Sequence, residues 1–412
     1  MHHQVLLSAV LTLVSIVVHG APTYDDSWFQ PENSPATALF KKRYVPSPSD
    51  ANFSSNYPPG WVTPPPSSLP ASWTAKLASL TLPNVGVSMP NNGYPTYPNG
   101  ESGADQNICS FTYQCTAPDD LLTPPDGVLA LTFDDGPTDS SPTLYSFLET
   151  NNISSKATHF MIGSNILSSP EDMQTAATAG GHIAVHTWSH LYTTTLSNEA
   201  VLAELGWTMQ IISDLNGGRL PKYWRPPYGD VDNRVRAIAK GVFGLTTVVW
   251  NQDTADWAIG TDPAYTISGV EATMDGWFKG PKSPGLCMLE HELNNNTVGV
   301  FMTEYPVMTE NGWIVKSVPD AFGMPWYQNA DGGNTGPVTS LAIGLGTLAI
   351  TNATSSTSSS SSMNSVTSAT ATAAVTAIAS KTPTKTGGSG RRSTLNSPKL
   401  LAVIGLVGAM LL

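Results

Sequence analysis

The chain has 412 residues, of which only 12% are charged, and its formal net charge is −12. With a pI near 5.0 it offers no basic surface for phosphate groups, so nucleic acids and other polyanions are poor candidate ligands. Proline, glycine, serine and threonine crowd both ends, which places the ordered core between about residues 105 and 330. We therefore expect one main folded domain.

Residues 1–20 have the pattern of a secretory signal peptide, because an apolar run over 5–18 is followed by small residues that suit cleavage before Ala21. This run and the apolar run 400–412 are both shorter than the ~20 residues that a helix needs to cross a bilayer. We expect a secreted chain without a transmembrane helix.

Residues 21–43 form a possible propeptide, because they end in the basic triplet Lys41-Lys42-Arg43, a candidate dibasic processing site. A solvated charge run is the alternative. The Pro-rich segment 44–125 follows, and the frequent proline excludes long helices and central strands from it. We expect this segment to wrap loosely around the domain or to be disordered.

Three cysteines in a secreted chain leave one unpaired after a disulfide forms. Cys109 and Cys115, close together in a loop flanked by proline, are the favoured pair. Cys287 lies in the apolar run 285–289, which is typical of a core strand with a buried, inert thiol. A long-range bridge from Cys109 or Cys115 to Cys287 stays open.

From residue 127 onwards strand-like and helix-like segments alternate. The expected strands are 128–133, 158–162, 183–185, 246–250 and 286–289, and the expected helices begin at Ser141-Pro142, at Ser169-Pro170, near Glu199 and near Asn233. Such alternation implies parallel strands covered by helices, either in an open sheet or in a barrel. We favour a (β/α) barrel, because no Gly-rich phosphate loop follows the first strand.

Asp134 and Asp135 end the first strand, within the motif TFDDGP. Burying two adjacent carboxylates without a nearby cation would cost several kcal/mol. A bound metal ion would provide the positive charge that offsets this cost. An Asp-Gly-Pro turn capped by side-chain hydrogen bonds is the alternative.

His186 and His190, in the motif HTWSH, are four residues apart, which predicts both imidazoles on one side of a helical turn. With Asp135 as the third ligand they would leave an open position for water, as in catalytic zinc sites. Only five histidines follow the signal peptide, so their abundance does not explain the cluster. We assign structural roles to His159 and His182.

Three later motifs add candidates for chemistry. The motif RPPYGD combines the cation Arg225 with a rigid turn. Arg225 could orient a carboxylate through a bidentate contact, and the turn could direct a backbone N–H into the site. A surface turn with a salt bridge is the alternative. WNQDTADW, residues 250–257, suits a sugar-binding wall, although tryptophan is also common in cores. His291 ends an apolar strand as a core histidine would, but Asp256 is a possible partner that would raise its pKa for proton donation.

Beyond the domain, residues 328–386 predict a Ser/Thr-rich stalk. Small residues at 387–389, a polar spacer and an apolar tail match a GPI-anchor signal over 387–412, with attachment at Gly387, Gly388 or Ser389. Possible N-glycosylation sites, each a short pattern with many chance matches, are Asn52, Asn152, Asn295 and Asn352.

In chain order TFDDGP, HTWSH, RPPYGD, WNQDTADW and LEH resemble the five motifs of the polysaccharide deacetylases, carbohydrate esterase family 4, over about residues 126–327. This resemblance implies a distorted (β/α) barrel with fewer than eight full repeats. It also implies one metal ion, usually Zn²⁺ with Co²⁺ or another divalent ion as alternatives, held by Asp135, His186 and His190.

The resemblance further implies a role for each remaining candidate. Amide hydrolysis needs an activated water, a stabilised oxyanion and a proton for the departing amine. By this resemblance Asp134 would be the general base, and Arg225 would orient its carboxylate. The backbone N–H of Tyr228 would bind the oxyanion, Trp250 would line the groove, and Leu289 would contact the acetyl methyl group. His291 would be the general acid, and Asp256 would tune its pKa.

A secreted, stalked and anchored deacetylase resembles the chitin deacetylases of fungal cell walls. That resemblance implies hydrolysis of the N-acetyl groups of chitin, a β-1,4-linked N-acetylglucosamine polymer, to give chitosan and acetate. We expect a monomer in the cell wall, held by a GPI anchor at the outer face of the plasma membrane. Alternatives are a deacetylase of xylan or peptidoglycan, or a noncatalytic chitin-binding wall protein; loss of Asp134 or His291 would have indicated the last.

Overall fold

The computed structural model describes residues 45–91 and 94–344, and the contacts below lie within the unit that begins at Pro46. Among these residues, no helix combines the length and the hydropathy that a membrane span requires. The expectations that fall outside the described residues are those for the signal peptide, the propeptide, most of the stalk, the anchor signal with Gly387, Gly388 and Ser389, and Asn352.

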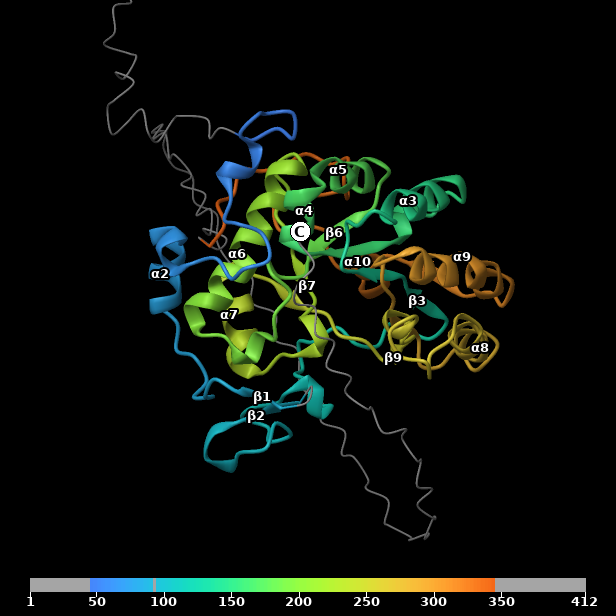
Figure 1. The fold of residues 1–412 in the computed structure, drawn as a ribbon, viewed down its shortest axis with the longest axis horizontal. Helices are drawn as coiled ribbons and strands as arrows, with labels where there is room; N and C mark the ends of the chain where they lie inside the picture. Colours follow the sequence, from blue (N-terminus) through green and yellow to red (C-terminus); the bar gives the residue numbers. More distant parts are fainter. Residues whose placement is uncertain (1–44, 92–93, 345–412) are drawn as a thin grey trace, which may run out of the picture. The chain divides into compact units, whose positions relative to one another are not determined.

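Parallel strands surrounded by helices form the centre of the fold (Figure 1). The strand orders are β11-β3-β10-β9 and β4-β5-β6-β7-β8, and every pairing in these two sheets is parallel. The strands are β3 (Val128–Ala130), β4 (Thr132–Asp134), β5 (Thr158–Met161), β6 (His182–Val185), β7 (Tyr223–Trp224), β8 (Thr246–Thr247), β9 (Gln252–Asp253), β10 (Leu286–Leu289) and β11 (Ile314–Lys316).

The two sheets close on each other into a distorted barrel. Leu131 alone separates β3 from β4, so both belong to one irregular strand. Similarly, β8 runs on into β9 through residues 248–251, and Asn251 N–H donates to the Cys287 carbonyl of β10. Because β10 pairs with β3 and β4 pairs with β5, the irregular strand formed by β3 and β4 joins the two sheets into one ring, with β11 added beside β3. The predicted (β/α) barrel is confirmed.

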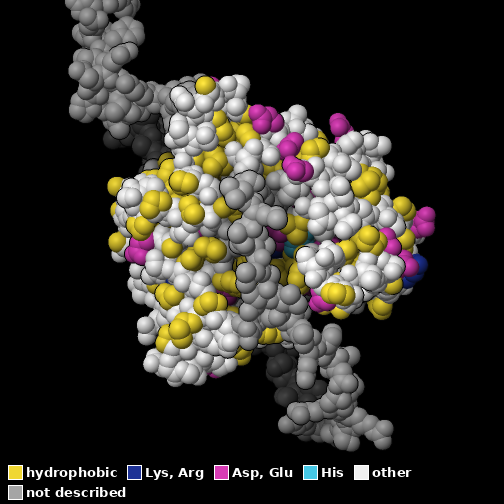
Figure 2. Space-filling view, viewed as in Figure 1, with side chains coloured by type: hydrophobic (Ala, Val, Ile, Leu, Met, Phe, Trp, Pro, Cys, Tyr) yellow, Lys and Arg dark blue, Asp and Glu magenta, His cyan; other side chains and the backbone are white. Residues whose placement is uncertain are grey.

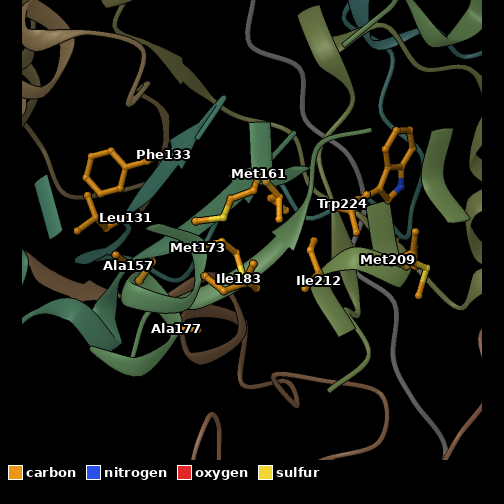
Figure 3. Close-up of a cluster of buried hydrophobic side chains, with 14 of the residues drawn as sticks. Leu131, Phe133, Ala157, Met161, Met173, Ala177, Ile183, Met209, Ile212 and Trp224 are labelled. Carbon is orange, nitrogen blue, oxygen red and sulfur yellow. The ribbon is translucent and has the colours of Figure 1, made fainter. Parts of the chain in front are cut away.

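Side chains alternate between the inside of the barrel and the layer under the helices. An inner cluster includes Ala130, Phe160, Ala184, Tyr223 and Cys287, while the outer cluster includes Leu131, Phe133, Met161, Ile183 and Trp224 (Figure 3). Val318 and Ala321 of α10 join the inner cluster and fill the end where the strands begin. The opposite end, where the strands stop, is left for polar residues.

The helices are α2 (Ala71–Ala78), α3 (Ser141–Thr150), α4 (Gly163–Ser168), α5 (Pro170–Thr178), α6 (Asn198–Leu215), α7 (Asn233–Phe243), α8 (Ile267–Phe278), α9 (Asn295–Glu310) and α10 (Val318–Phe322). Helices α6, α7, α8 and α9 each have an N-cap residue whose side chain accepts a hydrogen bond from a backbone N–H of the first turn. These N-cap residues are Ser197, Asp232, Thr266 and Asn294. The expected starts of α3, α5, α6 and α7 are confirmed.

Other elements differ from the sequence-based expectations. The strand expected over 246–250 is only two residues long: Val248 N–H still donates to the Trp224 carbonyl of β7, but Val248 also bridges Leu121, and the next residue, Val249, donates its N–H to the Leu121 carbonyl. Helices α8 and α9 were not expected, since α8 contains glycine and α9 contains Pro306, which lower helix propensity. The two helices pack against each other, and this packing outweighs the local preference.

The Pro-rich segment, expected to wrap loosely or to be disordered, packs closely on the barrel where the structure describes it. Helix α2 occupies a stretch without proline, and its Trp73 is 2% exposed. The Trp73 ring makes edge contacts with Trp207 of α6 and Phe243 of α7, and its Nε1 donates to the Ile343 carbonyl. Aromatic side chains thus anchor a segment that proline keeps irregular.

Short elements and one disulfide complete this segment. Strands β1 (Met89–Asn91) and β2 (Tyr94–Thr96) pair antiparallel. Cys109 and Cys115 form the favoured disulfide, and Cys287 is a free, buried thiol, so the alternative bridge to Cys287 is excluded.

The folded unit also extends past residue 327, where the stalk was expected to begin. The Asn329 side chain accepts from Leu220 N–H and donates to the Gly218 and Thr339 carbonyls. Asn52, Asn152 and Asn295 are all exposed, which leaves their predicted glycosylation sterically accessible.

Replacing Trp73 tests whether the Pro-rich segment is integral to the fold. We expect Trp73→Ala to lower the free energy of unfolding by ~3–5 kcal/mol, because it removes a buried aromatic ring and leaves a cavity. Chemical denaturation measures this loss. Trp61→Ala is the matched control, since Trp61 is 57% exposed and its loss should change stability by no more than ~0.5 kcal/mol. Equal stability of the two variants would contradict the prediction.

Candidate active site at the carboxyl end of the barrel

The alternation of side chains brings the candidate residues to the end of the barrel where the strands stop. Asp134 continues the inward positions of β3 and β4, His186 those of β6, and Arg225 those of β7. Leu289 and His291 lie two and four residues beyond the inward-facing Cys287 of β10. Near the centre of Figure 2, histidine and acidic side chains reach the surface together in a hollow, on a face with few basic groups.

Asp134 is held by a buried arginine. Arg225, which has no exposed surface, donates from Nη1 to Asp134 Oδ1 at 2.8 Å and to Thr132 Oγ1 at 2.8 Å. Its guanidinium carbon lies 4.4 Å from the centre of the Phe160 ring. Arg225 is thus in contact with a carboxylate and fully buried, so the alternative of a surface salt bridge is excluded. The predicted bidentate geometry is wrong, because Nη2 faces the Cys287 thiol.

Asp135 points to the two histidines instead. Its φ of +73° breaks the strand, so that the adjacent carboxylates enter different surroundings. Asp135 Oδ1 lies 3.3 Å from His186 Nε2 and 3.1 Å from His190 Nε2. Burial alone would raise the pKa of Asp135, but the neighbouring imidazoles, when protonated, hold it well below its usual range. The site therefore demands positive charge beside Asp135.

The segment from His186 to His190 is a loop, so the predicted helical turn is wrong. Thr187 and His190 have φ values of +63° and +57°, and this irregular path still brings the two imidazole centres within 5.0 Å. Glu204 of α6 fixes the loop: its Oε2 accepts from the N–H groups of Trp188 and Ser189, both at 2.8 Å. Sequence reasoning missed Glu204, whose signal is an acidic residue on the apolar face of a helix.

The Pro-rich segment covers the other side of this loop. Trp188 has no exposed surface, and its Nε1 donates to the Pro59 carbonyl at 2.9 Å. The Tyr57 ring stacks on Trp188 with ring centres 6.4 Å apart. The loop is thus held between α6 and a segment more than a hundred residues earlier.

Asp135, His186 and His190 fit a metal ion. One ligand atom from each lies within 4.8 Å of the others, which sets this trio apart as a possible metal-holding group in the described part of the chain. His186 Nδ1 lies 2.8 Å from the Arg225 carbonyl, and that hydrogen bond turns Nε2 towards Asp135. Asp135 Oδ1 is buried and lacks a hydrogen-bond partner in the described structure. A carboxylate and two imidazoles that face one another are a donor set suited to a divalent cation.

His291 is paired with Asp256, as predicted. Asp256 Oδ1 lies 2.6 Å from His291 Nδ1, and Oδ2 accepts from the His291 backbone N–H at 2.9 Å. Burial works to lower the pKa of His291, but the negative charge of Asp256 outweighs it and raises the pKa to about 10. His291 therefore carries a proton at neutral pH, with Nε2 turned away from Asp256.

The remaining predicted residues lie around the same centre. Tyr228 occupies a tight turn with a φ of +59°, and its hydroxyl is 3.1 Å from His190 Nδ1. Trp250 is half-buried, 5.8 Å from the Arg225 guanidinium carbon, and Leu289 is buried at the end of β10. His159 and His182 have structural partners, as expected; they are Glu292 for His159, and Thr158 and the Trp326 carbonyl for His182.

Comparison with known proteins adds independent evidence. A family model described as polysaccharide deacetylase matches residues 122–248. Chitin deacetylase 3 of Cryptococcus neoformans var. neoformans is 56% identical over 345 residues, which are 83% of this chain and 84% of that protein. Chitin deacetylase 2 of Cryptococcus neoformans var. grubii is 39% identical over 61% of this chain and 58% of its own length.

Among solved structures, the chitin deacetylase from Colletotrichum lindemuthianum is 24% identical with a TM-score of 0.46, over 51% of this chain and 95% of that one. The sequence match to the first Cryptococcus relative extends well beyond the catalytic motifs, over more than four fifths of both chains. Together with the family model, this match establishes that the chain belongs to the polysaccharide deacetylase family.

Proposed function

We propose that the chain is a metal-dependent deacetylase that hydrolyses the N-acetyl groups of chitin, giving chitosan and acetate. The observation that carries this proposal is the meeting of three units at one end of the barrel: Arg225 with Asp134, the Asp135–His186–His190 trio, and Asp256 with His291. The relatives named chitin deacetylases support the choice of substrate.

Asp135, His186 and His190 would hold the divalent cation, which we propose to be Zn²⁺ with Co²⁺ as an alternative. When bound, such an ion lowers the pKa of water towards ~7 and polarises a carbonyl oxygen. Asp135 contributes the negative charge, and the Arg225 carbonyl keeps His186 Nε2 available as a ligand.

Asp134 is the proposed general base. Its Oδ1 is occupied by Arg225, while Oδ2 lies 3.8 Å from His186 Nε2, beside the metal ligands. That oxygen is placed to accept the proton of the attacking water. The developing negative charge on the acetyl oxygen would be met by the backbone N–H of Tyr228.

His291 is the proposed general acid. Asp256 binds Nδ1 and leaves Nε2 free to protonate the amine as the carbon–nitrogen bond breaks. An amine leaves badly without this proton, so the raised pKa of His291 serves the reaction at neutral pH. Trp250 would line the sugar groove, and Leu289 would contact the acetyl methyl group.

Acetate release tests the reaction and the substrate together. We expect the purified protein to release acetate from N-acetylglucosamine oligomers, to lose this activity on dialysis against a chelator, and to regain it with added zinc. Acetylxylan and peptidoglycan fragments, assayed in parallel, test the alternative substrates. Release from either one alone would overturn the chitin assignment, and no release from any substrate would favour a noncatalytic chitin-binding role.

In the same assay, Asp134→Asn should lower turnover by ~10² or more while zinc content stays near the wild-type value, because only the base is lost. Asp119→Asn is the matched control, since this carboxylate is 75% exposed and pairs with Lys240 on the surface. Wild-type turnover in Asp134→Asn would remove the proposed base.

The pH profile tests the acid. With a pKa of about 10, His291 keeps its proton through neutrality, so kcat/KM should fall only as the pH rises through that value. Asp256→Asn removes the negative partner, which lowers the pKa of His291 and moves this alkaline fall to lower pH. Profiles measured between about pH 6 and 11 would show the shift; an unmoved alkaline limb would mean that His291 is not the acid.

We also propose that the chain acts as a monomer at the cell wall, exported by the signal peptide and attached through a GPI anchor. The sequence pattern over 387–412 supports the anchor. A phosphatidylinositol-specific phospholipase should release the protein from intact cells, and a chain ended before Gly387 should appear in the medium without that treatment. Retention of the shortened chain on the cells would count against the anchor.

A further inference from the structure

The side chain of Tyr228 contacts a metal ligand. Its hydroxyl lies 3.1 Å from His190 Nδ1, and the centres of the two rings are 4.7 Å apart. This contact is separate from the oxyanion role proposed above, which uses only the backbone N–H of Tyr228. One residue thus presents two different groups to the site.

The two histidine ligands are oriented in different ways. His186 Nδ1 faces the backbone carbonyl of Arg225 at 2.8 Å, an acceptor that no substitution removes. His190 Nδ1 faces a side-chain hydroxyl instead. If that oxygen accepts the Nδ1–H of His190, the tautomer is fixed and Nε2 is left for the metal, on the side of Asp135.

The surroundings hold the Tyr228 ring in place. Tyr192 stacks on it, with ring centres 4.2 Å apart and an interplanar angle of 19°. The loop that carries Tyr192 is fastened to the Tyr228 turn by Asp230, whose Oδ2 accepts from Thr194 N–H at 2.8 Å. On the other flank, a Cβ at Gly229 would come within 2.8 Å of Phe111, so this turn has little room to shift.

We propose that the Tyr228 hydroxyl positions His190 as a metal ligand and thereby sets the affinity of the site for its divalent cation. The hydroxyl accepts from Nδ1, and the stack with Tyr192 keeps it at the right distance. Tyr228 is in this respect a positioning residue that acts through His190. The inference rests on the metal site of the proposed function, but not on the identity of the polysaccharide.

Tyr228→Phe isolates this contact, because it keeps the ring, the stack and the backbone N–H and removes only the hydroxyl. We expect its zinc dissociation constant, measured without substrate by competition with a chromophoric chelator, to rise by about 10–100-fold. The visible absorption spectrum of the Co²⁺-loaded variant should also change, because the His190 imidazole is no longer held in one orientation.

Two further variants frame the result. Tyr192→Phe removes the hydroxyl from the other ring of the same stack and should bind zinc as the wild type does. His190→Ala gives the reference for complete loss of the ligand. Unfolding of the metal-free variants, followed by circular dichroism, should coincide with that of the wild type, and an unfolded Tyr228→Phe protein would assign the hydroxyl to stability and overturn the inference.

The inference is also overturned if Tyr228→Phe binds zinc within about twofold of the wild type with an unchanged Co²⁺ spectrum, while His190→Ala loses the metal. Failure of the proposed function gives a different pattern. In that case the wild type itself would not bind zinc, or His190→Ala would bind it as tightly as the wild type.

Discussion

Two consecutive buried carboxylates, Asp134 and Asp135, impose the constraint on which the site depends. Neighbouring carboxylates cannot both stay ionised inside a protein unless positive charge lies close to each. The left-handed backbone at Asp135 separates them, so that one meets Arg225 and the other meets the imidazoles of His186 and His190. The same separation suits adjacent residues to the different tasks proposed for them: Asp134, held by Arg225, for proton transfer, and Asp135 for binding a metal ion.

Local signals account for the parts of the fold that the sequence predicts well. A cap followed by proline marks the starts of α3 and α5, and the apolar run of β10 matches its predicted bounds. Polar motifs that follow such strands converge because parallel strands in a barrel all end on the same side. For that reason the convergence of Asp135, His186 and His190, and the pairing of Asp256 with His291, could be predicted from the sequence.

Features that depend on distant contacts were not predictable. The spacing of His186 and His190 indicated a helical turn, but Glu204 and the Pro-rich segment hold these residues in a loop instead. Proline content indicated a loosely attached or disordered segment, yet Trp73 finds partners more than a hundred residues away in α6 and α7. Helix propensity and hydrophobic periodicity depend on residues that are close together in the sequence. The interactions described here join residues that are far apart in the sequence and come together only on folding.

The hydrogen bond from the Trp188 indole to the Pro59 carbonyl has a consequence for how this family member can be dissected. The homologous region recognised by its family model begins at residue 122, well after Pro59. A fragment that begins at residue 122 would keep His186 and His190 but would lack Tyr57 and Pro59, which contact Trp188 in the loop between the two histidines. We therefore expect a stable catalytic fragment to begin upstream of Tyr57, because the residues around Pro59 help to hold the loop that carries both candidate metal ligands.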